Sequence, residues 1–84
     1  MELTEDEERI LAVAFRENYE VTQRFMAQIT NGAPDRHVHN EALLKEGIST
    51  GVLRAVLELR GHNVGDFTAE YQPKTDTVRI TKST

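Results

Sequence analysis

The first thirty residues of the chain carry an apolar stripe at helical spacing. Its members follow one another at steps of three, four or seven residues, and they are Leu11, Phe15, Thr22, Met26 and Ile29. This spacing matches the 3.6-residue period of an α-helix that buries one side. We therefore predict one long first helix, from about Thr4 to Asn31, with a length of roughly 42 Å at 1.5 Å per residue.

Both ends of this predicted helix carry the expected signals. Thr4 can act as the N-cap, and Glu7, three residues later, completes a Ser/Thr-x-x-Glu capping box. The acids at positions 5–8 lie where the helix dipole is positive, which favours a start here. At the other end, Gly32 can form a left-handed C-cap, and Pro34 prevents the helix from continuing.

The middle of the chain predicts shorter elements. Residues 35–39 follow a turn and are expected to form a brief strand. Asn40 is a good N-cap for a short helix over residues 41–46, and Gly47 is expected to end that helix.

A third helix is expected over residues 50–60. Ser49 is a suitable N-cap for it, and Gly61 follows its last residue. Ile48 stands between the second and third helices, and we expect it to be buried beneath the turn that joins them.

The last third of the chain changes period. Apolar residues alternate there with polar ones, at Phe67, Ala69 and Tyr71 and again at Val78 and Ile80. Strict alternation is typical of a strand with one buried face, and residues 73–76 supply a turn between two strands. We predict a β-hairpin, with residues 82–84 as a frayed end.

Together these elements predict an α+β fold in a single domain over residues 1–84, with three helices followed by a C-terminal β-hairpin. A hairpin alone is marginally stable in water, so its apolar face must pack on the helices. Within this domain we distinguish a long acidic N-terminal helix, residues 1–32, from a helix-turn-helix-like pair with its hairpin, residues 36–82.

The second and third predicted helices resemble a helix-turn-helix motif. Gly47 tolerates the positive φ of a tight turn, Ile48 offers an apolar plug beneath it, and Ser49 caps the second helix of the pair. Because a hairpin follows, residues 36–82 resemble the winged helix-turn-helix family. In that family the second helix of the motif enters the DNA major groove, and the hairpin is a wing that contacts the backbone or the minor groove. The alternative is a simple helix connection in a three-helix domain with a hairpin.

The resemblance implies a set of residues that contact double-stranded DNA. Arg54 would pair with a guanine edge, and Ser49 or Thr50 would hydrogen-bond a phosphate. The basic residues of the hairpin would form a strip that meets the DNA backbone, and they are Lys74, Arg79 and Lys82. So few contacts predict weak binding by a monomer, and useful affinity would need a dimer. The alternative interpretation of these charges is a solvated surface.

The charge distribution weighs against DNA binding. The net charge is −4, and residues 1–20 carry seven acids against two arginines, whereas residues 33–84 carry seven charges of each sign. A nucleic-acid binder usually has a basic excess. Two functions therefore stay open. One is a small DNA-binding transcriptional regulator of winged-helix type, and the other is a protein–protein interaction module, an adaptor or inhibitor whose acidic first helix docks on a basic partner.

The first helix is also the expected interface with a second copy or a protein partner. It is longer than a domain of this size can cover, so part of its stripe is expected to face a partner. The expected contact residues are Phe15, Tyr19, Phe25 and Met26, since aromatic residues and Met are enriched in interface cores. The alternative is that the helix breaks near residues 17–18 and folds back on its own core.

We expect no enzyme, cofactor or metal site. The sequence has no cysteine, hence no thiol nucleophile and no thiolate ligand. His37, His39 and His62 are a conceivable zinc set, but histidines one residue apart are common by chance, so we expect them on the surface. No apolar run approaches the ~20 residues of a membrane helix, and we expect a cytoplasmic protein.

Overall fold

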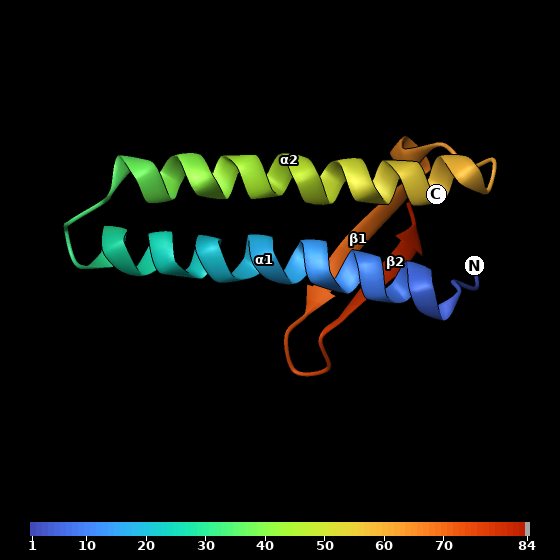
Figure 1. Ribbon diagram of the computed structural model, residues 1–84, viewed down its shortest axis with the longest axis horizontal. Coiled ribbons are helices and arrows are strands. Elements are labelled where there is room, and N and C mark those ends of the chain that lie inside the picture. The colour runs from blue at the N-terminus through green and yellow to red at the C-terminus, as the bar shows by residue number, and fades with distance from the viewer. Residues whose placement is uncertain (84) are drawn as a thin grey trace.

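The chain forms two long antiparallel helices with a β-hairpin on one side (Figure 1). The computed structural model describes residues 1–83 and measures 44 × 23 × 23 Å. Its elements in chain order are α1 (Glu5–Thr30), α2 (Arg36–Leu59), a 3-10 turn (Val64–Asp66), β1 (Phe67–Gln72) and β2 (Thr77–Lys82). The fold is α+β, as predicted, but it has two helices, so the predicted three-helix, winged-helix-like architecture is wrong.

The long first helix is confirmed. The Thr4 hydroxyl accepts a 3.1 Å hydrogen bond from the Glu7 amide, and the Glu7 carboxylate accepts one of 2.8 Å from the Thr4 amide. α1 ends at Thr30, close to Gly32, whose φ of 71° is the left-handed conformation that favours glycine. The helix is continuous, so the alternative of a break near residues 17–18 is wrong.

In the structure, the middle of the chain forms one helix instead of the separate elements predicted. α2 begins after Asp35, whose carboxylate accepts an amide hydrogen bond from the first turn, so the strand predicted at 35–39 is wrong. The helix continues through Gly47 without a turn, so the separate helices predicted over 41–46 and 50–60 are wrong as well. The helix-turn-helix geometry on which the family resemblance rested is therefore absent from the described residues.

Packing against α1 explains why α2 does not stop at Gly47. The buried residues between the helices repeat every seven positions, at Ala14 and Val21 on α1 and at Ala42, Ser49 and Val56 on α2. A seven-residue repeat keeps one side of a helix turned towards its neighbour over many turns. A glycine inside a helix costs only about 1 kcal/mol relative to alanine, which contact along the whole length outweighs. Ser49 therefore lies inside α2, where its hydroxyl donates to the Glu46 carbonyl at 2.9 Å instead of capping a new helix.

The β-hairpin is confirmed. β1 and β2 pair antiparallel from Phe67 opposite Lys82 to Gln72 opposite Thr77. The inward side chains of both strands pack on one apolar core, whose buried members are Leu11, Leu53, Val56 and Leu57. Leu11 and Leu57 have no exposed surface at all, so the hairpin completes the core that the helices begin.

The predicted fraying at the C-terminal end does not begin at Lys82. Lys82 is the last residue of β2, and the Ser83 amide donates a 2.8 Å hydrogen bond to the Asp66 carbonyl. Thr84, the remaining residue of the predicted frayed end, lies outside the described residues.

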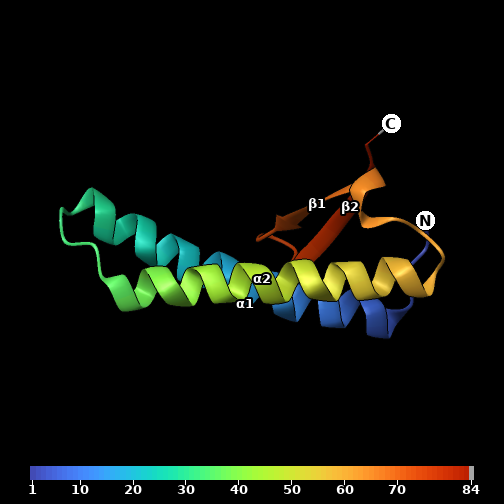
Figure 2. The same cartoon turned by 90° about the horizontal axis from the view of Figure 1, so that it is seen from above.

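The hairpin covers only one end of one side of the helix pair. Figure 2 shows both strands on one side of the helices, near the start of α1 and the end of α2. No strand lies over the end where α1 connects to α2 (Figure 1). The side of the helix pair that faces away from the hairpin has no covering element among the described residues.

Candidate functional site

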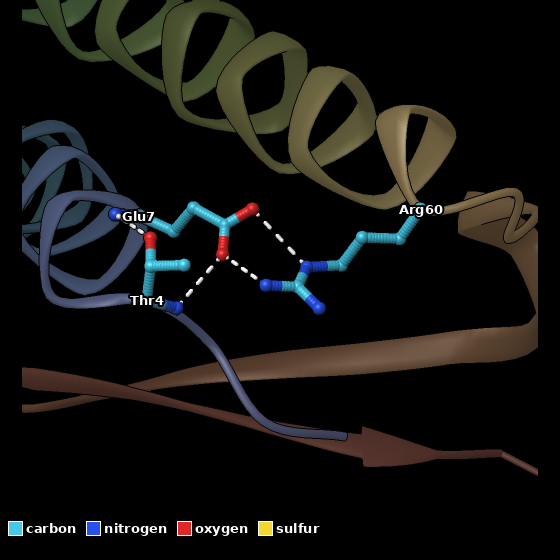
Figure 3. Close-up of polar contacts among 3 residues, drawn as sticks. All are labelled: Thr4, Glu7 and Arg60. Carbon is cyan, nitrogen blue, oxygen red and sulfur yellow. Dashed lines mark hydrogen bonds and ion pairs between the residues drawn. The ribbon is translucent and has the colours of Figure 1, made fainter.

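A polar cluster ties the start of α1 to the end of α2 (Figure 3). Arg60 donates from Nε to Glu7 Oε2 at 3.1 Å and from Nη2 to Glu7 Oε1, the oxygen that also accepts the Thr4 amide. The Arg60 hydrogen bond and then the Thr4 amide lower the pKa of Glu7 from 4.5 to about 2. The carboxylate is therefore held ionised, and it fixes the two helix ends beside each other.

A second polar contact ties α1 to the hairpin turn. Arg16 Nη1 donates a 2.8 Å hydrogen bond to Asp76 Oδ2. Asp76 has a φ of 52°, a left-handed conformation that aspartate tolerates in turns better than most residues. This contact and the packing of the strands hold the hairpin on one side of the helices and leave the other side open.

Helix geometry identifies the residues of that open side. Val13 lies two residues from both Leu11 and Phe15, which pack in the core beneath the hairpin. Two residues rotate a side chain by about 200° around a helix, so Val13 points away from the hairpin. Ile48 precedes Leu57 by nine residues, about two and a half turns, so it also points away.

A groove with apolar walls lies between the helices on the open side. It has a volume of about 370 Å³, and we define the open-face groove by its apolar lining residues, which are Ile10, Val13, Ala14, Ile48 and Val52. Ile10 is 52% exposed, Val13 40% and Ile48 43%. Three large apolar side chains therefore meet water in one place.

The charged residues of the open-face groove are paired within the chain. Glu17, which lines the groove, accepts from Lys45 of α2 at 3.2 Å. Arg9, its other charged lining residue, lies 3.4 Å from Asp6 one turn earlier. These exposed pairs contribute little to stability, but they balance the charge at the groove. Recognition there depends on apolar contact more than on net charge.

Comparison with known proteins identifies no relative: no family model, no curated protein and no solved structure matches this chain. The open-face groove is therefore interpreted from its own chemistry.

The residues expected to contact DNA from a recognition helix lie within α2. Ser49 is 2% exposed and lies between the helices, so its hydroxyl does not face solvent. Thr50 and Arg54 are exposed and lie four residues apart, on one side of α2. They stand in the interior of a long helix and not in the first turn of a recognition helix, where the resemblance placed them.

The basic residues of the hairpin do not share one face. Arg79 pairs with Glu70 across the strands at 3.1 Å, and Lys74 is exposed in the turn. Successive side chains of a strand point to opposite faces, so Arg79 and Lys82, three residues apart, point in opposite directions. The structure therefore does not bring the three cations together as one strip.

The aromatic residues expected at a partner interface have contacts inside the chain. Phe15 is half-buried against the core, and the Tyr19 ring lies 5.3 Å from the ring of Tyr71. Phe25 stacks on an imidazole of α2 at 4.6 Å, whereas Met26 is 54% exposed. The predicted interface is therefore divided between intramolecular packing and open surface.

The three histidines lie apart in the fold. His37 and His39 are both in α2, where residues two apart point about 160° away from each other, so they do not share the face that the predicted strand at 35–39 would have given them. The rings of His62 and Phe67 pack edge to face, with their centres 5.2 Å apart. Among residues 1–83, no three histidine or carboxylate side chains gather in a geometry that would hold a metal ion.

No helix within the described part of the chain combines the length and the apolar character needed to cross a membrane.

The sequence did contain one signal for the open-face groove. Leu44, Ile48 and Val52 repeat every four residues straight through Gly47. That spacing is helical, and it favours a continuous helix with a second apolar stripe over a turn with Ile48 beneath it. Because Gly47 also predicts the end of a helix, the sequence alone does not show that this stripe is continuous, and the groove is missed.

Proposed function

We propose that this chain is a non-enzymatic protein–protein interaction module that binds its partner through the open-face groove. The observation that carries the proposal is the exposure of Ile10, Val13 and Ile48 side by side in one groove. Single apolar residues on a surface are ordinary, but a contiguous group of them is typical of an interaction site.

The chemistry of the groove suggests the kind of partner. Its walls are apolar and its charges are already paired, so the partner must supply apolar side chains. An amphipathic helix that lays its apolar side between α1 and α2 meets this requirement. The exposed acids at the start of α1, namely Glu5, Asp6 and Glu8, favour a partner with basic residues at that end.

DNA binding by this chain stays a prediction. The helix-turn-helix that motivated it is absent from the described residues, but Arg54 and Lys74 are exposed. The experiment below therefore includes DNA. A cytoplasmic location belongs to the same proposal, and the lack of cysteine supports it, since proteins of oxidising compartments commonly use disulfides.

Photo-cross-linking tests the groove directly. A photoreactive amino acid at position 13 is expected to give covalent adducts of discrete mass with partner protein in a lysate of the source organism. The matched control is the same group at position 23, an exposed site of α1 outside the groove, and it is expected to give none.

Titration with DNA tests the alternative function, DNA binding. We expect no saturable binding of a mixed-sequence duplex at about 50 mM salt. Three results together would overturn the proposal in favour of DNA binding. The duplex would bind saturably and more weakly at about 200 mM salt, this binding would disappear in the Arg54→Ala, Lys74→Ala double variant, and position 13 would give no adducts.

A further inference from the structure

The outer edge of β1 pairs with no further strand among residues 1–83. β1 is the strand nearer to the end where α1 connects to α2, and no strand covers that end (Figures 1 and 2). β2 has a neighbour on its own side, since the N-terminal segment shares a cavity with Val78 and Ile80 and packs Leu3 on the core. The free edge of β1 is therefore the side on which the sheet can be extended.

The hydrogen bonding of the ladder shows which backbone groups of β1 face this free edge. The Ser83 amide donates to the Asp66 carbonyl at 2.8 Å, one position beyond the first pair of the ladder. Hydrogen-bonded pairs alternate with non-bonded pairs in an antiparallel ladder, so the even-numbered residues of β1 bond to β2. Ala69 and Tyr71 therefore direct their N–H and C=O groups to the free edge, where no hydrogen bond receives them within residues 1–83.

β1 lacks the features that protect most free edges. Natural edge strands are commonly blocked by lysine, by proline or by a bulge. β1 contains neither lysine nor proline, and its register with β2 is regular throughout. Its one charged residue, Glu70, pairs with Arg79 at 3.1 Å. A strand can therefore approach this edge without displacing a blocking side chain.

A groove lies between the free edge and α1. It has a volume of about 340 Å³ and is lined by residues 69–71 of β1 and by Phe15, Asn18, Tyr19 and Thr22 of α1, and we call it the β1 groove. Neighbouring strands of a sheet lie about 4.8 Å apart, so a strand added to β1 would lie in this groove.

The apolar side of α1 continues beyond the hairpin without cover. Met26 follows Phe15 by eleven residues and Ile29 follows Leu11 by eighteen, which are close to three and five helical turns. Both side chains therefore point to the hairpin side, and they are 54% and 48% exposed. Side chains of a helix lean towards its N-terminus, so Met26 leans towards the β1 groove.

α2 adds Leu43 to the same uncovered surface. Leu43 precedes Leu57 by fourteen residues, close to four turns, so it also points to the hairpin side, and it is 54% exposed. Lys45, two residues later, pairs with Glu17 of α1, which places Leu43 level with the β1 groove. Apolar side chains from both helices therefore surround the place where a third strand would lie.

We infer that β1 accepts an extended segment of a partner protein as a third strand. The free N–H and C=O groups of Ala69 and Tyr71 determine the form of the occupant, because a helix has already bonded its own backbone groups internally, whereas a strand has not. Every second side chain of the added strand points towards the helices. The segment therefore alternates apolar and polar residues, and its apolar side chains pack on Tyr19, Met26 and Leu43.

This site is separate from the open-face groove, which lies on the opposite side of the helix pair. The inference therefore does not depend on the proposed function. One strand of about six residues buries less than the ~800 Å² per partner of a standard stable complex, so an isolated peptide is expected to bind with a micromolar Kd.

Peptide selection tests the inference on the full chain. A phage-displayed library of random ten-residue peptides is selected against a Val13→Lys variant, in which a charge blocks the open-face groove. Val13 is 40% exposed, so the circular dichroism spectrum should stay that of the wild type. We expect enrichment of peptides with alternating apolar and polar residues.

Amide hydrogen exchange measured by NMR locates the bound peptide. The amides of Ala69 and Tyr71 should exchange rapidly in the free chain and at least about tenfold more slowly when the peptide is bound. The amides of Thr68 and Glu70 bond to β2 and should exchange slowly in both states, so they are the internal control.

A charge on the uncovered apolar surface tests the side-chain contacts. Met26→Lys should weaken binding of the selected peptide about tenfold, because it removes an apolar contact. Ala27→Lys adds the same charge at an exposed site about 100° further around α1, and it should bind like the parent chain. The inference would be overturned if no peptide were enriched, or if the bound peptides left exchange at Ala69 and Tyr71 unchanged. Cross-linking from position 13 tests the proposed function separately from either result.

Discussion

The Tyr71 hydroxyl donates a 2.5 Å hydrogen bond to Oδ1 of Asp76, across the turn between β1 and β2. The other oxygen of Asp76 accepts from Arg16, so one carboxylate holds the hairpin closed and joins it to α1. The hydrogen bond to Asp76 is the main reason that the pKa of Tyr71 is raised from 10.0 to about 12, and burial adds to it. Loss of the phenol proton would leave two negative oxygens in contact.

Asp76→Asn should return the ionisation of Tyr71 towards pH 10. Asparagine has the same size and also tolerates a positive φ, so the turn is preserved. The phenol absorbance should be titrated in a Tyr19→Phe background, which leaves Tyr71 as the one tyrosine of the chain. A midpoint that stays near pH 12 in the Asn variant would assign the shift to burial instead.

Glu7→Gln should destabilise the fold at neutral pH but not in strong acid. The pKa of Glu7 is lowered from 4.5 to about 2 in the folded chain, so its contribution is fully present above pH 4.5 and is lost as the pH falls towards 2. The difference in Tm between the wild type and Glu7→Gln should shrink over that range.

Glu5→Gln is the matched control for this effect. It removes an exposed acid from the first turn of the same helix, without the contact to Arg60. Its effect on Tm should be smaller. Equal losses in the two variants would mean that the helix dipole, and not the Arg60 pair, is responsible.

Gly47→Ala should stabilise the chain by about 0.5–1 kcal/mol, because the residue lies inside α2 and its missing Cβ has open space around it. The change in the free energy of unfolding should be measured by urea denaturation. Gly32→Ala should instead be destabilising, since a φ of 71° strains any residue with a Cβ. If Gly47→Ala instead destabilises the chain, this would support the tight turn at Gly47 that was predicted from the sequence.

Leu57→Ala should lower the free energy of unfolding by about 2–5 kcal/mol, since Leu57 is completely buried beneath the hairpin. Leu59→Ala removes the same atoms two residues later from a side chain that is 85% exposed. The free energy of unfolding of the Leu59→Ala variant should change by less than about 0.5 kcal/mol.

The sequence predicts those parts of the fold that local sequence signals determine. Thr4 and Glu7 make the same capping box in any helix that starts there, and the alternation through residues 67–80 allows one strand pair. The middle of the chain is different. Gly47 and Ser49 together suggest a stop and a start, but such preferences amount to about 1 kcal/mol per residue, and packing on α1 outweighs them.

The open-face groove could not be predicted for a related reason. α2 carries two apolar stripes of equal quality, one with Leu53 and Leu57 and the other with Leu44 and Ile48. Nothing in the local pattern says which stripe the hairpin covers. That choice depends on contacts such as the one between Arg16 and Asp76, which are 60 residues apart in the chain.

The order of the elements has a consequence for synthesis. Leu11 and Leu57 are covered by strands that the ribosome makes after both helices. Residues 60–82 take about 1–5 s to synthesise, and during that time α1 and α2 can already pair. The nascent helix pair then shows apolar side chains on two sides instead of one. A chain that ends before Phe67 should therefore aggregate far more readily than the full sequence.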